Sequence, residues 1–259
     1  MIYRFASFNI RNSTAADGPD SWVHRSGQVL DLLRYYAWDA VGFQELTGVQ
    51  KDAVARLPGY AHEGISRDND NNGEHCSVFY RTDRFERVDG GTFWLSPTPE
   101  VPLSVAWGSA CIRICTWVLL RDKRNGRSFA FVNTHLDHIS EEARAEGAKV
   151  VLERIKNQFA EIPVVLTGDF NATPEERCYR DITAVLTDTR RAAGALHYGP
   201  SGTFHGFRPD AASWGNLHEI DYIFVSRDIA TLKTRTIADR DDRGFPSDHF
   251  PIDAEVDIP

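Results

Sequence analysis

The order strand, helix, strand occurs twice in this chain of 259 residues, and this repeat strongly limits the folds that the chain can adopt. Apolar spacing predicts the elements at 5–10, 23–36 and 40–43 in the first half and at 129–133, 141–159 and 164–166 in the second. Each predicted helix has an apolar face that can cover a sheet. No low-complexity linker separates the halves, so we expect one α/β domain rather than two small ones.

Polar residues stand at the carboxyl ends of the predicted strands, where open α/β sheets usually build their sites. Gln44 and Glu45 follow a strand of the first half, and His135 and Asp169 follow strands of the second half. We therefore expect the two halves to face each other, with one site between their edges.

Capping residues predict where two helices begin. Ser140 precedes two glutamates, which is typical of an N-cap followed by an acidic first turn. The segment 173–176 reads Thr-Pro-Glu-Glu and matches a capping box with proline at the first helical position. This pattern predicts a short helix directly after Asn171.

The chain has a net charge of -8 and 42% apolar residues, which indicates a globular protein with an acidic surface. Such a surface repels a polyanion, so long duplex DNA is disfavoured, while short nucleic acid and small phosphate esters stay open. No leader, membrane span or basic amphipathic helix is evident. We expect no membrane contact, a monomer, and a cytoplasmic location unless a leader has been removed.

The segment between the two repeats is the least regular part of the sequence. Residues 67–73 are rich in Asn and Asp and predict a surface loop. Glu74 and His75 precede an apparent strand at 77–80, where they could reach the site or cap the strand. We expect residues 65–110 to supply substrate specificity.

Six polar segments carry the chemistry, and each alone fits a turn, a cap or a polar strand end. They are Ser-Phe-Asn-Ile at 7–10, Gln-Glu at 44–45, Asn-Thr-His-Leu at 133–136, Gly-Asp-Phe-Asn at 168–171, Ile-Asp-Tyr at 220–222 and Ser-Asp-His at 247–249. Together, in this order, they resemble the endonuclease/exonuclease/phosphatase superfamily over residues 3–256. Segments 93–96, 113–117 and 203–207 further resemble a bacterial group related to its deadenylase-like branch.

This resemblance implies a single domain over residues 1–259, folded as a four-layer α/β sandwich of two mixed sheets with helices outside. It also implies a hydrolase that cleaves a phosphate ester by in-line attack of an activated water, as a phosphodiesterase, nuclease or phosphatase. The substrate within these classes stays open, because sugar, inositol, lipid and nucleic-acid esters share the machinery.

A phosphate ester is anionic, so an attacking hydroxide is repelled unless a divalent cation neutralises charge. The resemblance makes Glu45 the principal metal ligand, with Asn9 adjacent and Asp248 close by. Carboxylate and amide oxygens without a His and Cys cluster favour Mg²⁺ or Mn²⁺.

The resemblance also assigns roles around the phosphate. Asp169 corresponds to the general base, and Asn171 to its partner in positioning the water or stabilising charge. His249 would hydrogen-bond a non-bridging phosphate oxygen, with its imidazole fixed and made more basic by Asp221. His135 would be a second donor on the opposite side.

Two residues are candidates for contact with the substrate. Arg113 lies in an apolar strand and needs an anionic partner, either the substrate phosphate or a structural carboxylate. His205 lies between Phe204 and Phe207 and could contact the leaving group or a stacked base, although plain packing of a loop is the favoured interpretation.

Two alternatives come from other classes of protein. Asn133, His135, Asp137 and His138 have the spacing of the metallo-β-lactamase zinc signature, but Asn replaces its first histidine. A catalytically inactive binding module on the same fold is the second, although each expected polar position is filled.

Overall fold

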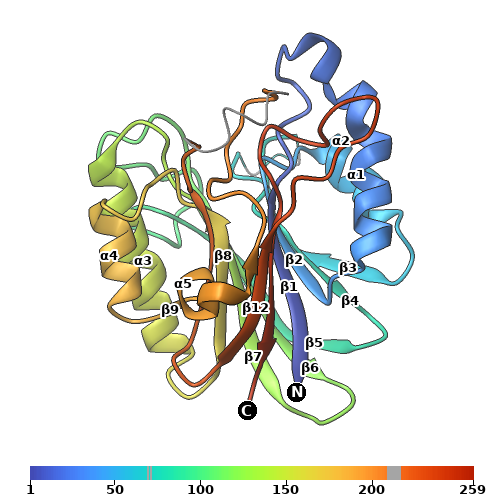
Figure 1. Ribbon diagram of the computed structural model, residues 1–259. Helices are drawn as coiled ribbons and strands as arrows, with labels where there is room; N and C mark the ends of the chain where they lie inside the picture. Colours follow the sequence, from blue (N-terminus) through green and yellow to red (C-terminus); the bar gives the residue numbers. More distant parts are fainter. Residues whose placement is uncertain (69, 71, 209–216) are drawn as a thin grey trace.

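Two β-sheets lie face to face in the centre of the molecule, and helices cover their outer faces (Figure 1). The computed structural model describes residues 1–68, 70, 72–208 and 217–259. Over this part of the chain the layers are helix, sheet, sheet and helix, in one domain. The four-layer sandwich predicted from the sequence is confirmed.

The first sheet has seven strands within the described residues, and its first and last strands in the sequence, β1 and β13, are antiparallel neighbours. The strand order is β10 (His197–Tyr198), β12 (Ala230–Thr236), β13 (Ile252–Asp257), β1 (Ile2–Asn9), β2 (Ala40–Gln44), β4 (Val78–Arg81) and β3 (Tyr60–Glu63).

The second sheet has six strands within the same ranges and is also mixed. The strand order is β5 (Phe85–Trp94), β6 (Ile114–Asp122), β7 (Ser128–His135), β8 (Val164–Asp169), β11 (Asp221–Val225) and β9 (Thr187–Asp188).

Helices α1 (Trp22–Tyr36) and α2 (Gly48–Ala55) pack on the first sheet, and α3 (Glu141–Gln158) and α4 (Arg177–Thr183) pack on the second. The short helices are α5 (Thr189–Ala193) and the 3₁₀ turns η1 (Gly18–Asp20) and η2 (Gly194–Leu196). No helix in the described ranges is both long and apolar enough to cross a bilayer.

Both predicted strand–helix–strand units are present, one in each sheet. Strands β1 and β2 pair in parallel on either side of α1, and β7 and β8 do so on either side of α3. In both units the helix packs on the outer face. The carboxyl ends of all four strands therefore lie at the same end of the sandwich.

The core alternates with the side-chain period of the strands. In β1, Tyr3 and Phe5 point between the sheets, whereas Ala6 and Phe8 pack under α1. Toward the end of the strand the inner face turns polar, with Ser7 and then Asn9, both buried. The second sheet changes in the same way along β7 and β8, which end at buried histidine and aspartate side chains.

A layer of buried amides and a hydroxyl joins the sheets below the polar strand ends. Gln44 Nε2 donates to Asn133 Oδ1 at 2.6 Å, and Thr167 Oγ1 donates to the same oxygen at 3.0 Å. Asn133 Nδ2 donates to the Phe43 carbonyl at 2.8 Å. These hydrogen bonds fix the distance between the halves directly beneath the site.

Of the two predicted helix starts, one is confirmed and one is wrong. The Ser140 hydroxyl accepts from the Ala143 backbone N–H at 3.1 Å, as an N-cap does. Helix α4, however, begins at Arg177 and not directly after Asn171. Glu176 Oε1 accepts from the Thr173 backbone N–H at 3.4 Å, as a capping box requires, and its Oε2 binds the guanidinium of Arg144 at 2.6 Å, but 173–176 form a turn that precedes the helix.

The predicted loop at 67–73 connects β3 and β4. Its residues 69 and 71 lie outside the described part of the chain.

Candidate active site

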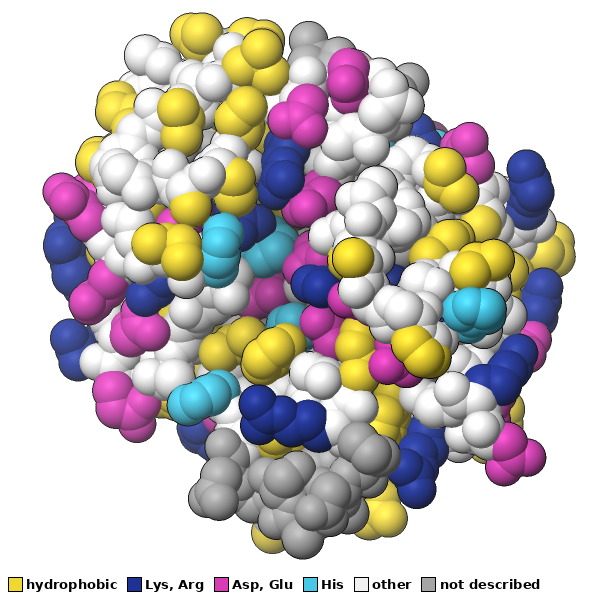
Figure 2. All heavy atoms as spheres, turned by 90° about the horizontal axis from the view of Figure 1, so that it is seen from above, with side chains coloured by type: hydrophobic (Ala, Val, Ile, Leu, Met, Phe, Trp, Pro, Cys, Tyr) yellow, Lys and Arg dark blue, Asp and Glu magenta, His cyan; other side chains and the backbone are white. Residues whose placement is uncertain are grey.

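A cleft of about 650 Å³ opens where the carboxyl ends of the central strands meet. Figure 2 looks down on this face, and acidic, basic and histidine side chains gather in the hollow at its centre. Strand β11 runs antiparallel to β8, so Asp221 at its start lies opposite Asp169 at the end of β8. Glu45, which follows β2 of the first sheet, lines the same cleft, so both sheets contribute to one site.

Asn9 links the two halves of this site. It is buried just below the cleft, and its Nδ2 donates to Glu45 Oε1 at 3.1 Å and to Asp169 Oδ2 at 2.9 Å. Glu45 belongs to the first sheet's half and Asp169 to the second. One amide therefore fixes the predicted metal ligand relative to the predicted base.

Glu45 is held as a charged carboxylate. Burial alone would raise the pKa of Glu45, but hydrogen bonds from Asn12 and Asn9 and the charge of His249 outweigh burial and lower it. Asn12 donates to Glu45 Oε2 from its backbone N–H at 3.0 Å and from its side chain at 3.1 Å.

Asp248 also lines the cleft, and burial together with the nearby charge of Glu45 raises its pKa against the opposing charge of His249. A carboxylate whose ionised form is disfavoured by burial and by a neighbouring carboxylate is stabilised by a cation between the two. Asn9 Oδ1 accepts from the Arg11 backbone N–H at 3.0 Å and keeps a second lone pair. These oxygen donors fit a hard divalent cation held by Glu45 and Asp248, with Asn9 below.

His249 lies between two buried carboxylates. Its Nδ1 is 2.9 Å from Asp221 Oδ2, and its Nε2 is 3.8 Å from Asp169 Oδ2. Burial lowers the pKa of His249, but the two aspartates together outweigh burial and raise it to about 10. Burial and the Asp221 charge also raise the pKa of Asp169, to about 7. At neutral pH the imidazole is therefore protonated, and Nε2–H is a donor.

Asn171 holds the other side of Asp169. Its backbone N–H donates to Asp169 Oδ1 at 2.9 Å, and its Nδ2 contacts His135 Nε2 at 2.9 Å and the Leu136 carbonyl at 3.1 Å. The carbonyl fixes Nδ2 as the donor, so His135 Nε2 accepts. Burial and the charge of Arg113 lower the pKa of His135 well below its usual value. In this arrangement the neutral His135 does not donate from Nε2, which differs from the donor role that the resemblance implied.

The two predicted substrate contacts have different outcomes. Arg113 is buried, lines the cleft and approaches Asp137 at 3.9 Å. His205 does not line the cleft: it is 1% exposed and stacks on Phe250 with ring centroids 4.2 Å apart. Burial lowers the pKa of His205 to about 3. The structure thus corrects the substrate-binding role of His205 and favours plain packing.

Several cleft residues were not found from the sequence. Arg11 makes a bidentate ion pair with Asp17 at 2.9 and 3.0 Å, and its Nε lies 3.7 Å from Asp248. Its place two residues after Asn9 was a usable signal. The others are Asn12, Arg67, Cys111, His138, Phe204 and Phe207. Most of these stand on loops whose path depends on tertiary contacts.

The residues with zinc-signature spacing are dispersed. Asn133 is in the buried layer between the sheets, while His135 faces the cleft. The Asp137 carboxylate accepts from the backbone N–H groups of residues 110, 139 and 140 and from the Ser109 hydroxyl. Cys111, Asp137 and His138 are close enough to share an ion, but the aspartate oxygens are already engaged and Arg113 lies beside them.

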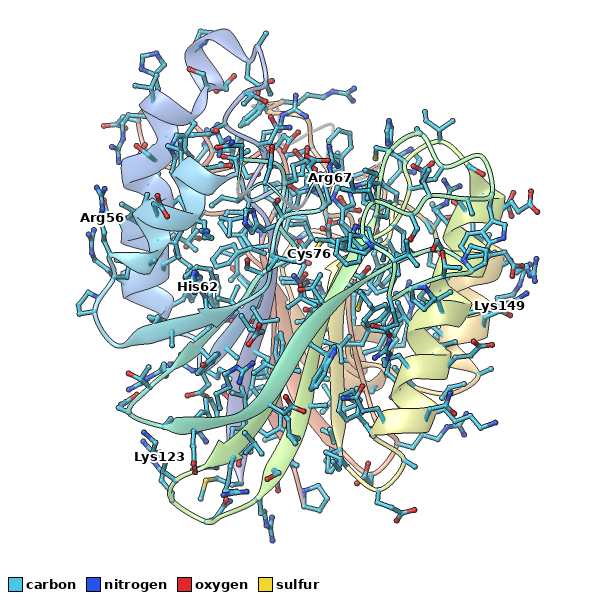
Figure 3. All side chains as sticks on the ribbon, turned by 180° about the vertical axis from the view of Figure 1, so that it is seen from behind. Arg56, His62, Arg67, Cys76, Lys123 and Lys149 are labelled. Carbon is cyan, nitrogen blue, oxygen red and sulfur yellow. The ribbon has the colours of Figure 1, made fainter. Side chains whose placement is uncertain are left out.

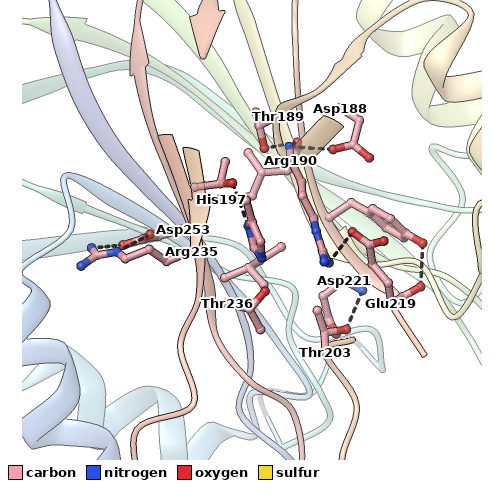
Figure 4. A pocket seen from close by; sticks show the side chains of 14 residues that line it. Asp188, Thr189, Arg190, His197, Thr203, Glu219, Asp221, Arg235, Thr236 and Asp253 are labelled. Carbon is pink, nitrogen blue, oxygen red and sulfur yellow. Dashed lines mark hydrogen bonds and ion pairs between the residues drawn. The ribbon is translucent and has the colours of Figure 1, made fainter. Parts of the chain in front are cut away.

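A small enclosed cavity of about 20 Å³ lies behind Asp221, away from the cleft (Figure 4). Asp221 Oδ1, His197 Nε2 and Thr236 Oγ1 belong to residues that line it, and none of these three atoms has a hydrogen-bond partner among the described residues. Thr203 Oγ1 accepts from the Asp221 backbone N–H at 3.2 Å. The carboxylate that orients His249 therefore belongs to a residue at this cavity and has one oxygen without a hydrogen-bond partner among the described residues.

The comparisons with known proteins agree with this geometry. The model of the Endonuclease/Exonuclease/phosphatase family matches residues 6–249. A solved endonuclease/exonuclease/phosphatase from Bacteroides vulgatus is 34% identical, with a TM-score of 0.94 and full coverage of both chains. The mannosyl-6-phosphatase of Bacteroides thetaiotaomicron is 36% identical, with a TM-score of 0.92 over 99% of this chain and 100% of that one.

Among curated proteins, Nocturnin of Mus musculus is 23% identical over 96% of this chain. The chain spans 63% of the length of that relative. The family match covers most of the sequence, and the fold and cleft agree with it. The chain therefore belongs to the Endonuclease/Exonuclease/phosphatase family, whose members are phosphoesterases and generally depend on a divalent metal.

Proposed function

We propose that the protein hydrolyses a small phosphate ester with a bound Mg²⁺ or Mn²⁺ and a water activated by Asp169. The observation that carries this proposal is the pair of hydrogen bonds that Asn9 Nδ2 donates, to Asp169 Oδ2 at 2.9 Å and to Glu45 Oε1 at 3.1 Å. A base and a cation-binding carboxylate held by one amide can act on the same phosphate.

Asp169 acts as the base. Its raised pKa makes it a stronger proton acceptor than a free aspartate, and the Asn9 and Asn171 donors hold its plane. When water attacks phosphorus, Asp169 takes the water's proton and the ester oxygen leaves on the opposite side.

His249 binds the phosphate. Its protonated Nε2 donates to a non-bridging oxygen, and the negative charge that grows in the transition state strengthens this hydrogen bond. Asp221 keeps the imidazole charged and oriented from behind. A divalent cation held by Glu45 and Asp248 would neutralise phosphate charge when bound.

A small substrate is supported by two observations. The net charge of -8 opposes a long polyanion. The relative that is 36% identical over nearly the full chain is named a mannosyl-6-phosphatase, and this name supports a small phosphomonoester as the substrate in preference to a polymer.

The test is hydrolysis of a chromogenic phosphomonoester and the matching diester, with Mg²⁺, Mn²⁺ or chelator, by wild type and by Asp169→Asn. We expect turnover that needs the metal and falls by roughly 10²–10⁴-fold in the variant, the usual size of a general-base effect. Glu86→Asn, an exposed change on β5, is the matched control and should keep wild-type rates. Equal rates for Asp169→Asn and wild type would overturn the assigned base.

A further inference from the structure

One side of the cleft is a wall of four polar side chains that the steps above do not use: Arg67, Glu74, Arg113 and His138. We call it the polar wall. It comes from the loop between β3 and β4, the start of β6 and the turn after β7. Figure 3 shows Arg67 at the same end of the molecule as the cleft, far from Lys123 at the opposite end.

Arg67 and Glu74 form a fixed donor and acceptor pair. Arg67 Nη1 lies 2.7 Å from Glu74 Oε2, and both side chains are about one fifth exposed. The backbone at Arg67 is held twice: its N–H donates to the Glu74 carbonyl at 2.9 Å, and its carbonyl accepts from Trp94 Nε1 at 3.1 Å. The pair is therefore placed before any substrate arrives.

Arg113 has unused hydrogen-bonding capacity. Its side chain is 6% exposed, yet its Nε has no hydrogen-bond partner in the described part of the chain. Its Nη2 contacts His138 Nδ1 at 3.2 Å. A guanidinium only donates, so Nδ1 accepts and the proton of the neutral His138 is on Nε2. The Arg113 Nε is the guanidinium atom 3.9 Å from Asp137 Oδ2, so Arg113 is held on this side by charge alone while it lines the cleft.

The charges of the polar wall determine which chemical groups of a substrate can bind there. Arg67 is balanced by Glu74, and Arg113 is balanced in part by Asp137 at 3.9 Å. A second anionic group would meet the Glu74 carboxylate and be repelled. A hydroxyl group both donates and accepts, so neighbouring hydroxyls can donate to Glu74 and accept from the arginines.

Three other residues of the cleft lining are apolar. Phe204 is 37% exposed at the cleft, and Phe207 and Ile220 lie beside it in the lining. The Phe204 ring also packs against the imidazole of His249, with centroids 4.9 Å apart. If the leaving group of the substrate contains a ring, one face of that ring can contact these apolar side chains, and its edge can contact the hydrogen-bond donors and acceptors of the polar wall.

We propose that the polar wall binds the hydroxyl groups of a sugar, so that the substrate is a sugar phosphomonoester whose ring lies between the wall and Phe204. This inference rests on the proposed phosphoesterase function and adds the leaving group and the residues that recognise it. Glu74 and Arg113 determine specificity and take no part in bond cleavage.

The test compares mannose 6-phosphate and glucose 6-phosphate with cyclohexylmethyl phosphate, which keeps the ring but has no hydroxyls. Wild type should prefer a sugar phosphate in kcat/KM. Glu74→Gln, Arg67→Gln and Arg113→Lys should each lower kcat/KM at least tenfold more for the sugar phosphate than for cyclohexylmethyl phosphate, because only the sugar uses the wall. The exposed changes Glu86→Gln and Arg56→Gln should not alter this ratio.

A binding measurement separates recognition from turnover. In the Asp169→Asn protein with Mg²⁺, calorimetric titration should show tighter binding of the sugar phosphate than of inorganic phosphate. Glu74→Gln in that background should remove most of the difference. Glu74 and Arg67 are partly exposed, so these two variants test the proposal even where Arg113→Lys fails to fold.

Two results would overturn the inference while leaving the proposed function intact. They are cleavage of cyclohexylmethyl phosphate as efficient as that of both sugars, and equal losses on all esters in the wall variants. Metal-independent rates, or no phosphate release from any ester, would instead overturn the proposed function.

Discussion

At the scale of single residues, hydrogen bonds from neighbouring side chains and backbone hold two residues of the site in uncommon backbone conformations. Glu45 directly follows β2 and Asn171 lies two residues after the end of β8, and both have left-handed backbone conformations, with φ of 59° and 47°. Such conformations cost about 1–3 kcal/mol in a residue with a side chain and persist where hydrogen bonds fix them. Here Asn12 and Asn9 hold Glu45, and Leu136 and His135 hold Asn171.

The charge of His249 should depend on Asp221. In Asp221→Asn the nearest anion is lost while burial remains, so the pKa of His249 should fall from about 10 to well below that value. Wild type should keep a protonated imidazole through neutral pH, and the variant should titrate at lower pH. NMR titration of histidine resonances in metal-free protein measures this change. An unchanged pKa would mean that Asp169 alone sustains the charge.

The cavity behind Asp221 should hold one ordered water. Its volume of about 20 Å³ is enough for about one molecule. Asp221 Oδ1, His197 Nε2 and Thr236 Oγ1 can supply its partners. A high-resolution crystal structure should show the water within hydrogen-bond distance, roughly 2.6–3.2 Å, of at least two of these atoms. A dry cavity, or a water bound to neither Asp221 nor His197, would contradict this expectation.

At the scale of elements, the period of two along each strand separates packing from chemistry. The same face of β1, β7 and β8 is apolar in the middle of the sandwich and polar at the cleft. Between these zones the sheets approach closely at Gly42. A Cβ there would lie 2.3 Å from Thr167 Oγ1 and 2.4 Å from Asn133 Oδ1.

Gly42→Ala should therefore destabilise the fold, because both neighbours are buried and engaged in hydrogen bonds. Overpacking of this kind costs about 1–3 kcal/mol in the free energy of unfolding, which urea denaturation can measure. Gly91→Ala in β5 is the matched control, since its Cβ would meet Trp117 at 3.5 Å, an ordinary contact. A similar loss in both variants would show that strand glycine, and not the close approach, sets the cost.

The two strand–helix–strand units could be predicted from the sequence, because amphipathic spacing and polar strand ends are visible in short segments. The sequence was insufficient for α4, which begins at Arg177 although Glu176 accepts from the Thr173 backbone N–H, and Glu176 also binds Arg144 of α3, a contact that local sequence does not show. The candidate substrate contact of His205 is corrected for a related reason, whereas the favoured packing agrees with the structure: its burial against Phe250 follows from the folded loop. The polar wall was also missed in large part, since Arg67 and Arg113 meet only in the tertiary structure.

At the scale of the whole molecule, the site is where the two sheets' polar ends are joined. Glu45 follows β2, Asp248 precedes the last strand, and Asp169 ends β8 in the other sheet. Burial raises the pKa of Asp248 and of Asp169, and a neighbouring carboxylate adds to the rise in each case, Glu45 beside Asp248 and Asp221 beside Asp169. Repulsion at the joint between the layers makes the stability of the fold sensitive to any cation bound there.

Mg²⁺ or Mn²⁺ should therefore stabilise the folded protein. A ligand at about 100 times its Kd adds roughly 2.7 kcal/mol, which corresponds to a rise of roughly 5–11 °C in Tm for a protein of this size class. Thermal unfolding across a metal titration should show a rise that chelator reverses, and Glu45→Gln should shift it to higher metal concentration. Asp89→Asn, an exposed carboxylate on β5, is the control and should respond like wild type. Because this readout needs no substrate, an identical response in Glu45→Gln would remove Glu45 from the metal site even if the protein still cleaved phosphate esters.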